Sequence, residues 1–190
     1  MTLELDAGAG EPEADRPRRP GALLNAAETR LLISALMLVT GAIAASTVVT
    51  IPASIRPVVV LAHIAFTVAG LGAVLSLDWY GLLVAIGWLT VGDVLVHERR
   101  ISPMIWIGVA GLVVSGSLLS PTITHTLTAI KLIAVLGTVT VGVLTLGLTR
   151  RMQATLPRVR PLHFRLLIVL GVISQVCWWT AVVIGFVNHG

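Results

Sequence analysis

The chain has 190 residues, of which 56% are hydrophobic and only 12% are charged, and its formal net charge is +4. An ordinary water-soluble domain has about twice that charged fraction, so the composition excludes such a domain and predicts a protein that lies in lipid. Because a bilayer core of about 30 Å needs about 20 residues per helix, the length allows five or six membrane spans and no separate soluble domain.

Residues 1–29 mix acidic and basic side chains with proline and glycine, a composition too polar to bury a core. We predict that they form a disordered cytoplasmic tail and that residues 30–190 form the membrane bundle. The first predicted span is 31–51. A cleaved signal peptide is the alternative for this segment, but the acidic tail before it is a poor leader, which favours a retained helix.

Four further segments are apolar and long enough to cross a bilayer. They are 58–77, 103–119, 126–148 and 166–187. The last of them contains the single cysteine, Cys177, which excludes an intrachain disulfide.

Segment 81–96 is apolar but short, and it decides the topology. If it spans the bilayer, there are six spans and the arginines divide eight to four between the two sides. If it lies along the interface or re-enters, there are five spans, and eleven arginines share one side while only Arg56 lies on the other. The positive-inside rule favours the second arrangement. We therefore predict an all-α bundle of five spans in a bacterial inner membrane, with the N-terminus cytoplasmic and the C-terminus outside.

His63 and Lys131 are ionisable side chains within predicted spans. Such groups are costly in lipid, which makes them candidates for function. His63 lies six residues past Pro57 and Lys131 six past His125, the residues just before their spans. At a rise of about 1.5 Å per residue, both are expected roughly 9 Å below the outer face.

The last span runs in the opposite direction and carries Trp178 and Trp179 to a similar predicted level, with Gln175 one turn below Trp179. We therefore expect an outer-leaflet pocket that is lined by His63, Lys131 and these three residues. Simpler interpretations stay open: the lysine extends to the interface, the imidazole bonds a neighbouring backbone group or threonine, and the tryptophans belong to an interface belt.

A second polar group is expected at the inner side. Asp93 and His97 are four residues apart, so the carboxylate can orient the imidazole. Arg99 and Arg100 can grip propionates, phosphates or lipid headgroups by paired hydrogen bonds. The alternative is that this cluster only anchors its segment at the membrane surface.

Three stretches of the sequence resemble segments of a group of small bacterial membrane proteins. That group includes the HemJ-type protoporphyrinogen oxidases and the CopD-type copper-resistance proteins. The three stretches are LAHIAFTVAGLGAVL, HERRISPMIWIGVAGLVVSGSLL and LTAIKLIAVLG followed by TRRM, within about 58–187. The resemblance implies that His63 corresponds to a haem-associated histidine and Lys131 to a membrane lysine of the family.

Three functions follow as hypotheses. The first is a haem-associated membrane oxidoreductase with His63 as the metal ligand. The second is a non-enzymatic transporter or accessory subunit for a metal ion, a proton or a small solute. The third is a scaffold that binds lipid, a membrane-protein partner or a second copy through small residues such as Gly111 and Ser115. No catalytic residue is assigned, and nucleic acid is excluded because no basic stripe is interleaved with aromatic residues.

Overall fold

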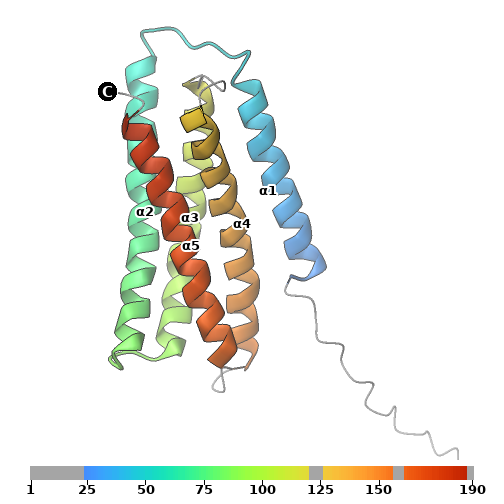
Figure 1. Cartoon of the computed structure of the whole chain (residues 1–190), viewed down its shortest axis with the longest axis vertical. Helices are drawn as coiled ribbons and strands as arrows, with labels where there is room; N and C mark the ends of the chain where they lie inside the picture. Colours follow the sequence, from blue (N-terminus) through green and yellow to red (C-terminus); the bar gives the residue numbers. More distant parts are fainter. Residues whose placement is uncertain (1–23, 120–125, 156–160, 188–190) are drawn as a thin grey trace, which may run out of the picture.

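The chain is described here by a computed structural model, which covers residues 24–119, 126–155 and 161–187. These residues form five helices and no strand (Figure 1). The helices are α1 (Ala26–Ala45), α2 (Arg56–Ala85), α3 (Val91–Leu118), α4 (Thr126–Thr155) and α5 (Pro161–Val187). All five are long and apolar enough to cross a membrane, so the protein is a multi-pass integral membrane protein.

The helices run alternately up and down in Figure 1. We call the end at which α1, α3 and α5 begin the lower end, and the opposite end the upper end. The predicted five-span, all-α architecture is confirmed. Residues 1–23 of the predicted tail (1–29), the predicted loop at 120–125, and 156–160 of the basic loop predicted at 150–165 lie outside the described residues. The rest of that basic loop is helical, in α4 and α5.

Residues 81–96 form no separate interfacial or re-entrant segment, which corrects one detail of the prediction. They are the last turn of α2, a tight turn, and the first turns of α3. Gly87 makes the reversal with a φ of +80°, a conformation that side chains disfavour. Thr90 and Asp93 then form a capping box that starts α3. The apolar segment is therefore divided between two spans.

Helix α1 begins at Ala26, earlier than the predicted boundary at 31, because Asn25 and Glu28 cap its first turn. The Asn25 side chain accepts a hydrogen bond from the Glu28 N–H at 2.7 Å, and the Glu28 carboxylate accepts one from the Asn25 N–H at 2.9 Å. The helix ends at Ala45, before the predicted end at 51. The residues 47–51 are all β-branched and precede Pro52, a combination that disfavours helix.

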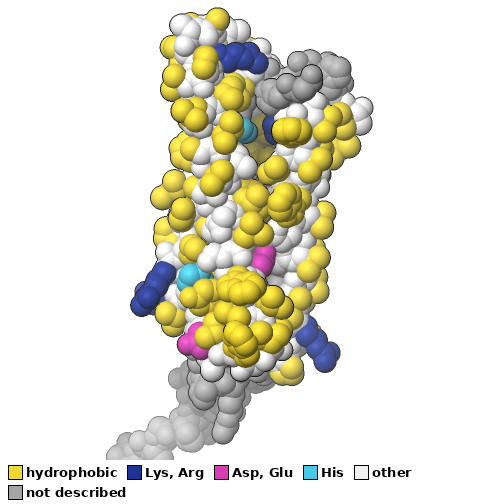
Figure 2. All heavy atoms as spheres, turned by 90° about the vertical axis from the view of Figure 1, so that its left-hand side faces the viewer, with side chains coloured by type: hydrophobic (Ala, Val, Ile, Leu, Met, Phe, Trp, Pro, Cys, Tyr) yellow, Lys and Arg dark blue, Asp and Glu magenta, His cyan; other side chains and the backbone are white. Residues whose placement is uncertain are grey.

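The bundle is built from two antiparallel hairpins, since α2 packs mainly on α3 and α4 mainly on α5, while α1 lies against α3 and α4. Side chains from all five helices meet in or around the main core, which includes Val39, Leu71, Val109, Val139 and Trp178. The outer surface is also largely apolar, as Figure 2 shows for one face. A surface of this kind is stable against lipid and not against water.

Candidate functional site

His63 lies on α2 and bonds to α3. Its Nδ1 is 2.8 Å from the hydroxyl oxygen of Ser115, which is itself buried. That hydroxyl has one hydrogen, and it is donated to the Gly111 carbonyl at 2.5 Å. With that hydrogen on Gly111, Ser115 accepts from His63, an arrangement in which the neutral ring carries its proton on Nδ1. Gly116 lies against the same ring, because a Cβ on it would be 3.3 Å from His63 Cε1.

Lys131 lies on α4 and reaches toward α5. A Cβ on Gly185 would lie 3.7 Å from the Lys131 ammonium nitrogen, so the absence of a side chain there makes room for the lysine. Among the described residues, the ammonium has no hydrogen-bond or ion-pair partner. Figure 2 shows a histidine and a basic side chain at a recess in the upper half of the face that carries α2. We call the region around His63, Ser115 and Lys131 the upper recess.

The other three residues of the predicted pocket lie elsewhere. Trp178 is 3% exposed and its ring fills a notch at Gly70, where a Cβ would be 2.7 Å from the indole. Gly70 is two turns below His63 on α2, so the indole lies deeper than the upper recess. Trp179 is 49% exposed on the outside of the bundle. Gln175 donates a hydrogen bond to Asp78 and not to a residue of the upper recess.

Asp78 is a site residue that sequence reasoning treated only as an interface marker. Its side chain is exposed, lies 3.7 Å from the position of a Cβ on Gly171, and joins α2 to α5 through Gln175. The carbonyl oxygen of Gln175 is buried and has no partner among the described residues. No sequence signal pairs Asp78 with Gln175, because they are 97 residues apart on helices that have few contacts.

The inner cluster is arranged differently from the prediction. Asp93 bonds to the Thr90 N–H and hydroxyl and so caps α3, and it has no hydrogen bond to His97 among the described residues. His97 instead bonds to Ser76 of α2 at 3.0 Å and stacks on Tyr80, with ring centroids 3.8 Å apart. Its role is to join α2 to α3 near the lower end. Arg99 and Arg100 are exposed.

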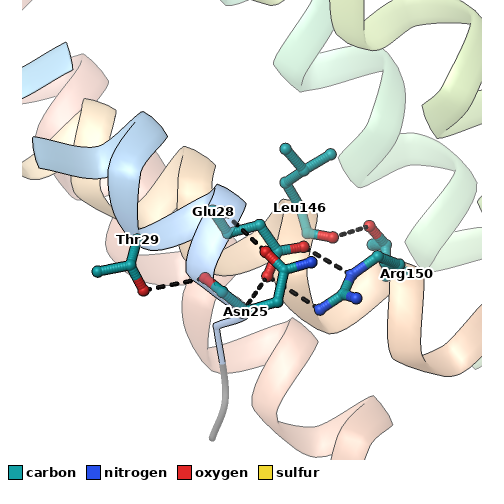
Figure 3. Close-up of polar contacts among 6 residues, drawn as sticks. Asn25, Glu28, Thr29, Leu146 and Arg150 are labelled. Atoms are coloured by element: carbon teal, nitrogen blue, oxygen red, sulfur yellow. Dashed lines mark hydrogen bonds and ion pairs between the residues drawn. The ribbon is translucent and has the colours of Figure 1, made fainter. Parts of the chain in front are cut away.

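A second polar region lies near the lower end, between α1, α3 and α4. Glu28 is 6% exposed and forms an ion pair with Arg150, in which Nε is 2.6 Å from Oε1 and Nη2 is 3.0 Å from Oε2 (Figure 3). This paired geometry ties α1 to α4. Both residues line a cavity of about 620 Å³, which we call the lower cavity.

The lower cavity also contains Glu98, which is only 9% exposed. Its carboxylate has no hydrogen-bond or ion-pair partner in the described part of the chain. Sequence reasoning missed this region because it assigned Glu28 to the tail. The Asn25 to Glu28 spacing is a capping-box pattern that could have placed Glu28 at a helix start.

Comparison with known proteins finds no family model, no curated protein and no solved structure that matches the chain. The resemblance to the HemJ-type and CopD-type families therefore stays a prediction. The described residues contain no group of three or more His, Cys, Asp or Glu side chains arranged to hold a metal ion.

Proposed function

We propose that the protein is a haem-associated redox protein of the membrane, with His63 as the axial ligand. The observation that carries the proposal is the 2.8 Å contact between His63 Nδ1 and the Ser115 hydroxyl, whose own hydrogen has an acceptor in the Gly111 carbonyl. Histidines that ligate a metal usually donate their second ring N–H to a neighbouring acceptor, which fixes both the tautomer and the ring orientation. Here the acceptor is itself fixed by its bond to Gly111.

The residues of the upper recess fit this group in two respects. The imidazole of His63 is a side chain that would hold the iron, and the Lys131 ammonium can pair with a propionate. Gln175, Trp178 and Trp179 do not contribute, since the first bonds Asp78, the second fills the Gly70 notch and the third faces outward. When bound, haem supplies one-electron chemistry; the chain orients the imidazole and balances the negative charge.

The test is an absorption spectrum of the detergent-purified protein, as isolated and after incubation with haem. We expect a Soret band that His63→Ala abolishes and that Lys131→Leu weakens. His97→Ala is the matched control, because that histidine is tied to Ser76 and Tyr80 at the other end of the bundle. Absence of a Soret band after reconstitution would contradict the proposal, as would an unchanged spectrum in His63→Ala.

A second function, proton or small-cation transport, is favoured by Asp78. Its carboxylate lies between the two hairpins, where α2 and α5 have few contacts, and an ionisable group at such a seam is typical of a transport pathway. The protein in liposomes would then dissipate an imposed pH gradient or take up a cation, and Asp78→Asn would abolish this flux. Asp93→Asn is the control, since Asp93 only caps α3. Haem-free protein with flux would favour this function over the first.

For the orientation, we propose that the lower end faces the cytoplasm of a bacterial cell. Among the described residues, Arg56 lies at the upper end, and the other arginines lie within ten residues of a lower helix end. These are Arg30, Arg99, Arg100, Arg150, Arg151 and Arg165. Such an asymmetry is typical of the cytoplasmic side.

A further inference from the structure

The lower cavity is lined by two opposite charges that have no partner among the described residues. Glu98 is buried, lines the cavity and has no bonded partner among the described residues. Arg99 also lines it, is exposed, and has none in the same ranges. The two cannot pair closely, because consecutive helical residues point about 100° apart.

The nearby ion pair does not neutralise Glu98. The Glu28 carboxylate already accepts from Arg150 Nε, Arg150 Nη2 and the Asn25 N–H, as Figure 3 shows. Arg150 is therefore oriented toward α1. The Glu98 carboxylate instead opens on the lower cavity, where a ligand can supply the donor that the described residues do not.

The position of the lower cavity limits what that ligand can be. Glu98 is seven residues from the start of α3 and Arg150 five from the end of α4, so both lie roughly 8–10 Å from the lower helix ends. This is the depth at which lipid headgroups meet acyl chains. The remaining cavity wall includes apolar side chains from three helices: Leu31, Pro103, Trp106 and Leu146.

We propose that the lower cavity binds the headgroup of phosphatidylethanolamine. The primary ammonium donates hydrogen bonds to Glu98, the phosphate lies against Arg99 at the mouth, and the start of an acyl chain lies along Leu31 and Trp106. A quaternary choline ammonium has no N–H to donate, so the site distinguishes phosphatidylethanolamine from phosphatidylcholine. Helix α1 forms one wall, and the bound lipid would thus help to hold α1 on α3 and α4.

Lipid titrations of the intact detergent-purified chain, followed by native mass spectrometry, test this proposal. We expect wild-type protein to bind phosphatidylethanolamine about tenfold more tightly than phosphatidylcholine. This is about the factor in affinity that one charge-assisted hydrogen bond contributes. Glu98→Gln should reduce this preference to about one. Arg99→Gln should weaken both lipids by about the same factor and keep the preference. Arg100→Gln is the control, because its exposed side chain does not line the lower cavity.

Two outcomes of the lipid titrations would overturn the proposal. One is equal affinity of wild-type protein for the two lipids. The other is a preference for phosphatidylethanolamine that survives in Glu98→Gln. Water-soluble phosphoethanolamine, added as a competitor, identifies the source of the headgroup: displacement of the lipid at equal concentration would assign the lower cavity to a soluble zwitterion instead. Thermal midpoints of each variant in lipid-free detergent check folding, and Arg99→Gln, at an exposed position, tests the site independently of the buried change.

Discussion

Gly70 of α2 lies directly against Gly108 of α3, so that the two backbones touch. A Cβ on Gly108 would lie 2.5 Å from the Gly70 Cα and 2.8 Å from its nitrogen, distances that real Cβ atoms do not show. Trp178 of α5 then covers this contact from the second hairpin. The same small residues therefore hold α2 on α3 and accept the side chain that joins the two hairpins.

The first prediction concerns this glycine contact. Gly108→Ala forces α2 and α3 apart, because the added methyl group meets backbone atoms that cannot rotate away. We expect a loss of about 1–3 kcal/mol in the free energy of unfolding, as in other overpacked cores. Gly72→Ala is the control: no atom lies within 4 Å of its Cβ position, and it should be neutral or slightly stabilising. Detergent-denaturant titrations measure both; equal stability of the two variants would contradict the contact.

The paired tryptophans give the second prediction. Trp178→Ala empties the notch at Gly70 and should cost about 3–5 kcal/mol, the usual cost of removing a buried aromatic ring. Trp179→Ala removes a half-exposed ring and should cost much less. The same titrations compare them. A larger loss for Trp179 would mean that α5 is rotated from the position described here.

The span count was predictable from sequence because it depends on two simple quantities, hydrophobic length and arginine distribution. The exact ends were less predictable, since they depend on local capping. Asn25 with Glu28, and Thr90 with Asp93, start α1 and α3 through hydrogen bonds that hydropathy does not report. Gly87 then divides an apolar segment that hydropathy treats as continuous.

The predicted pocket was wrong at Gln175 because residue counts along each helix were used to estimate depth in the membrane. Depth along a straight span places Gln175 near His63, but Gln175 bonds Asp78, a residue four turns further down α2. Helix α5 crosses the bundle obliquely in Figure 1, so equal counts along α2 and α5 do not give equal heights. Tilt and helix rotation come from packing contacts such as Trp178 on Gly70, and these cannot be read from one sequence.

The third prediction is the orientation of the bundle. In a Cys177→Ser background, a cysteine at Trp88, in the turn between α2 and α3, should react with a membrane-impermeant maleimide only after the cells are opened. A cysteine at Ala53, between α1 and α2, should react in intact cells. The reverse pattern would place the lower end outside, against the arginine distribution.

The ion pair between α1 and α4 gives the fourth prediction. Arg150→Glu leaves Glu28 buried beside a second carboxylate and should lower the free energy of unfolding by about 2–4 kcal/mol, since a buried charge loses its partner. Glu28→Arg combined with Arg150→Glu should recover part of this loss. Arg30→Lys, at an exposed position on α1, is the control. Additive losses in the double variant would show that the two side chains do not act as a pair.

The last prediction tests the hydrogen bond that orients His63, and it needs no bound group. Nitrogen-15 spectra of histidine-labelled protein should show His63 with its proton on Nδ1, because Ser115 gives its own hydrogen to Gly111 and can only accept. Ser115→Ala removes that acceptor, so we expect the share of His63 with its proton on Nδ1 to fall. Ser117→Ala is the matched control, since that hydroxyl donates to the Val113 carbonyl at 2.7 Å and not to the ring.

A His63 proton found on Nε2 in the wild-type protein would contradict this arrangement, and it would also remove the lone pair on which the proposed ligand role depends. An unchanged spectrum in Ser115→Ala would instead mean that another group fixes the ring. A proton on Nε2 would remove the chemical basis for coordination by that nitrogen. An unchanged Ser115→Ala spectrum would leave that basis in place, and the ring would then be oriented by a part of the bundle other than α3.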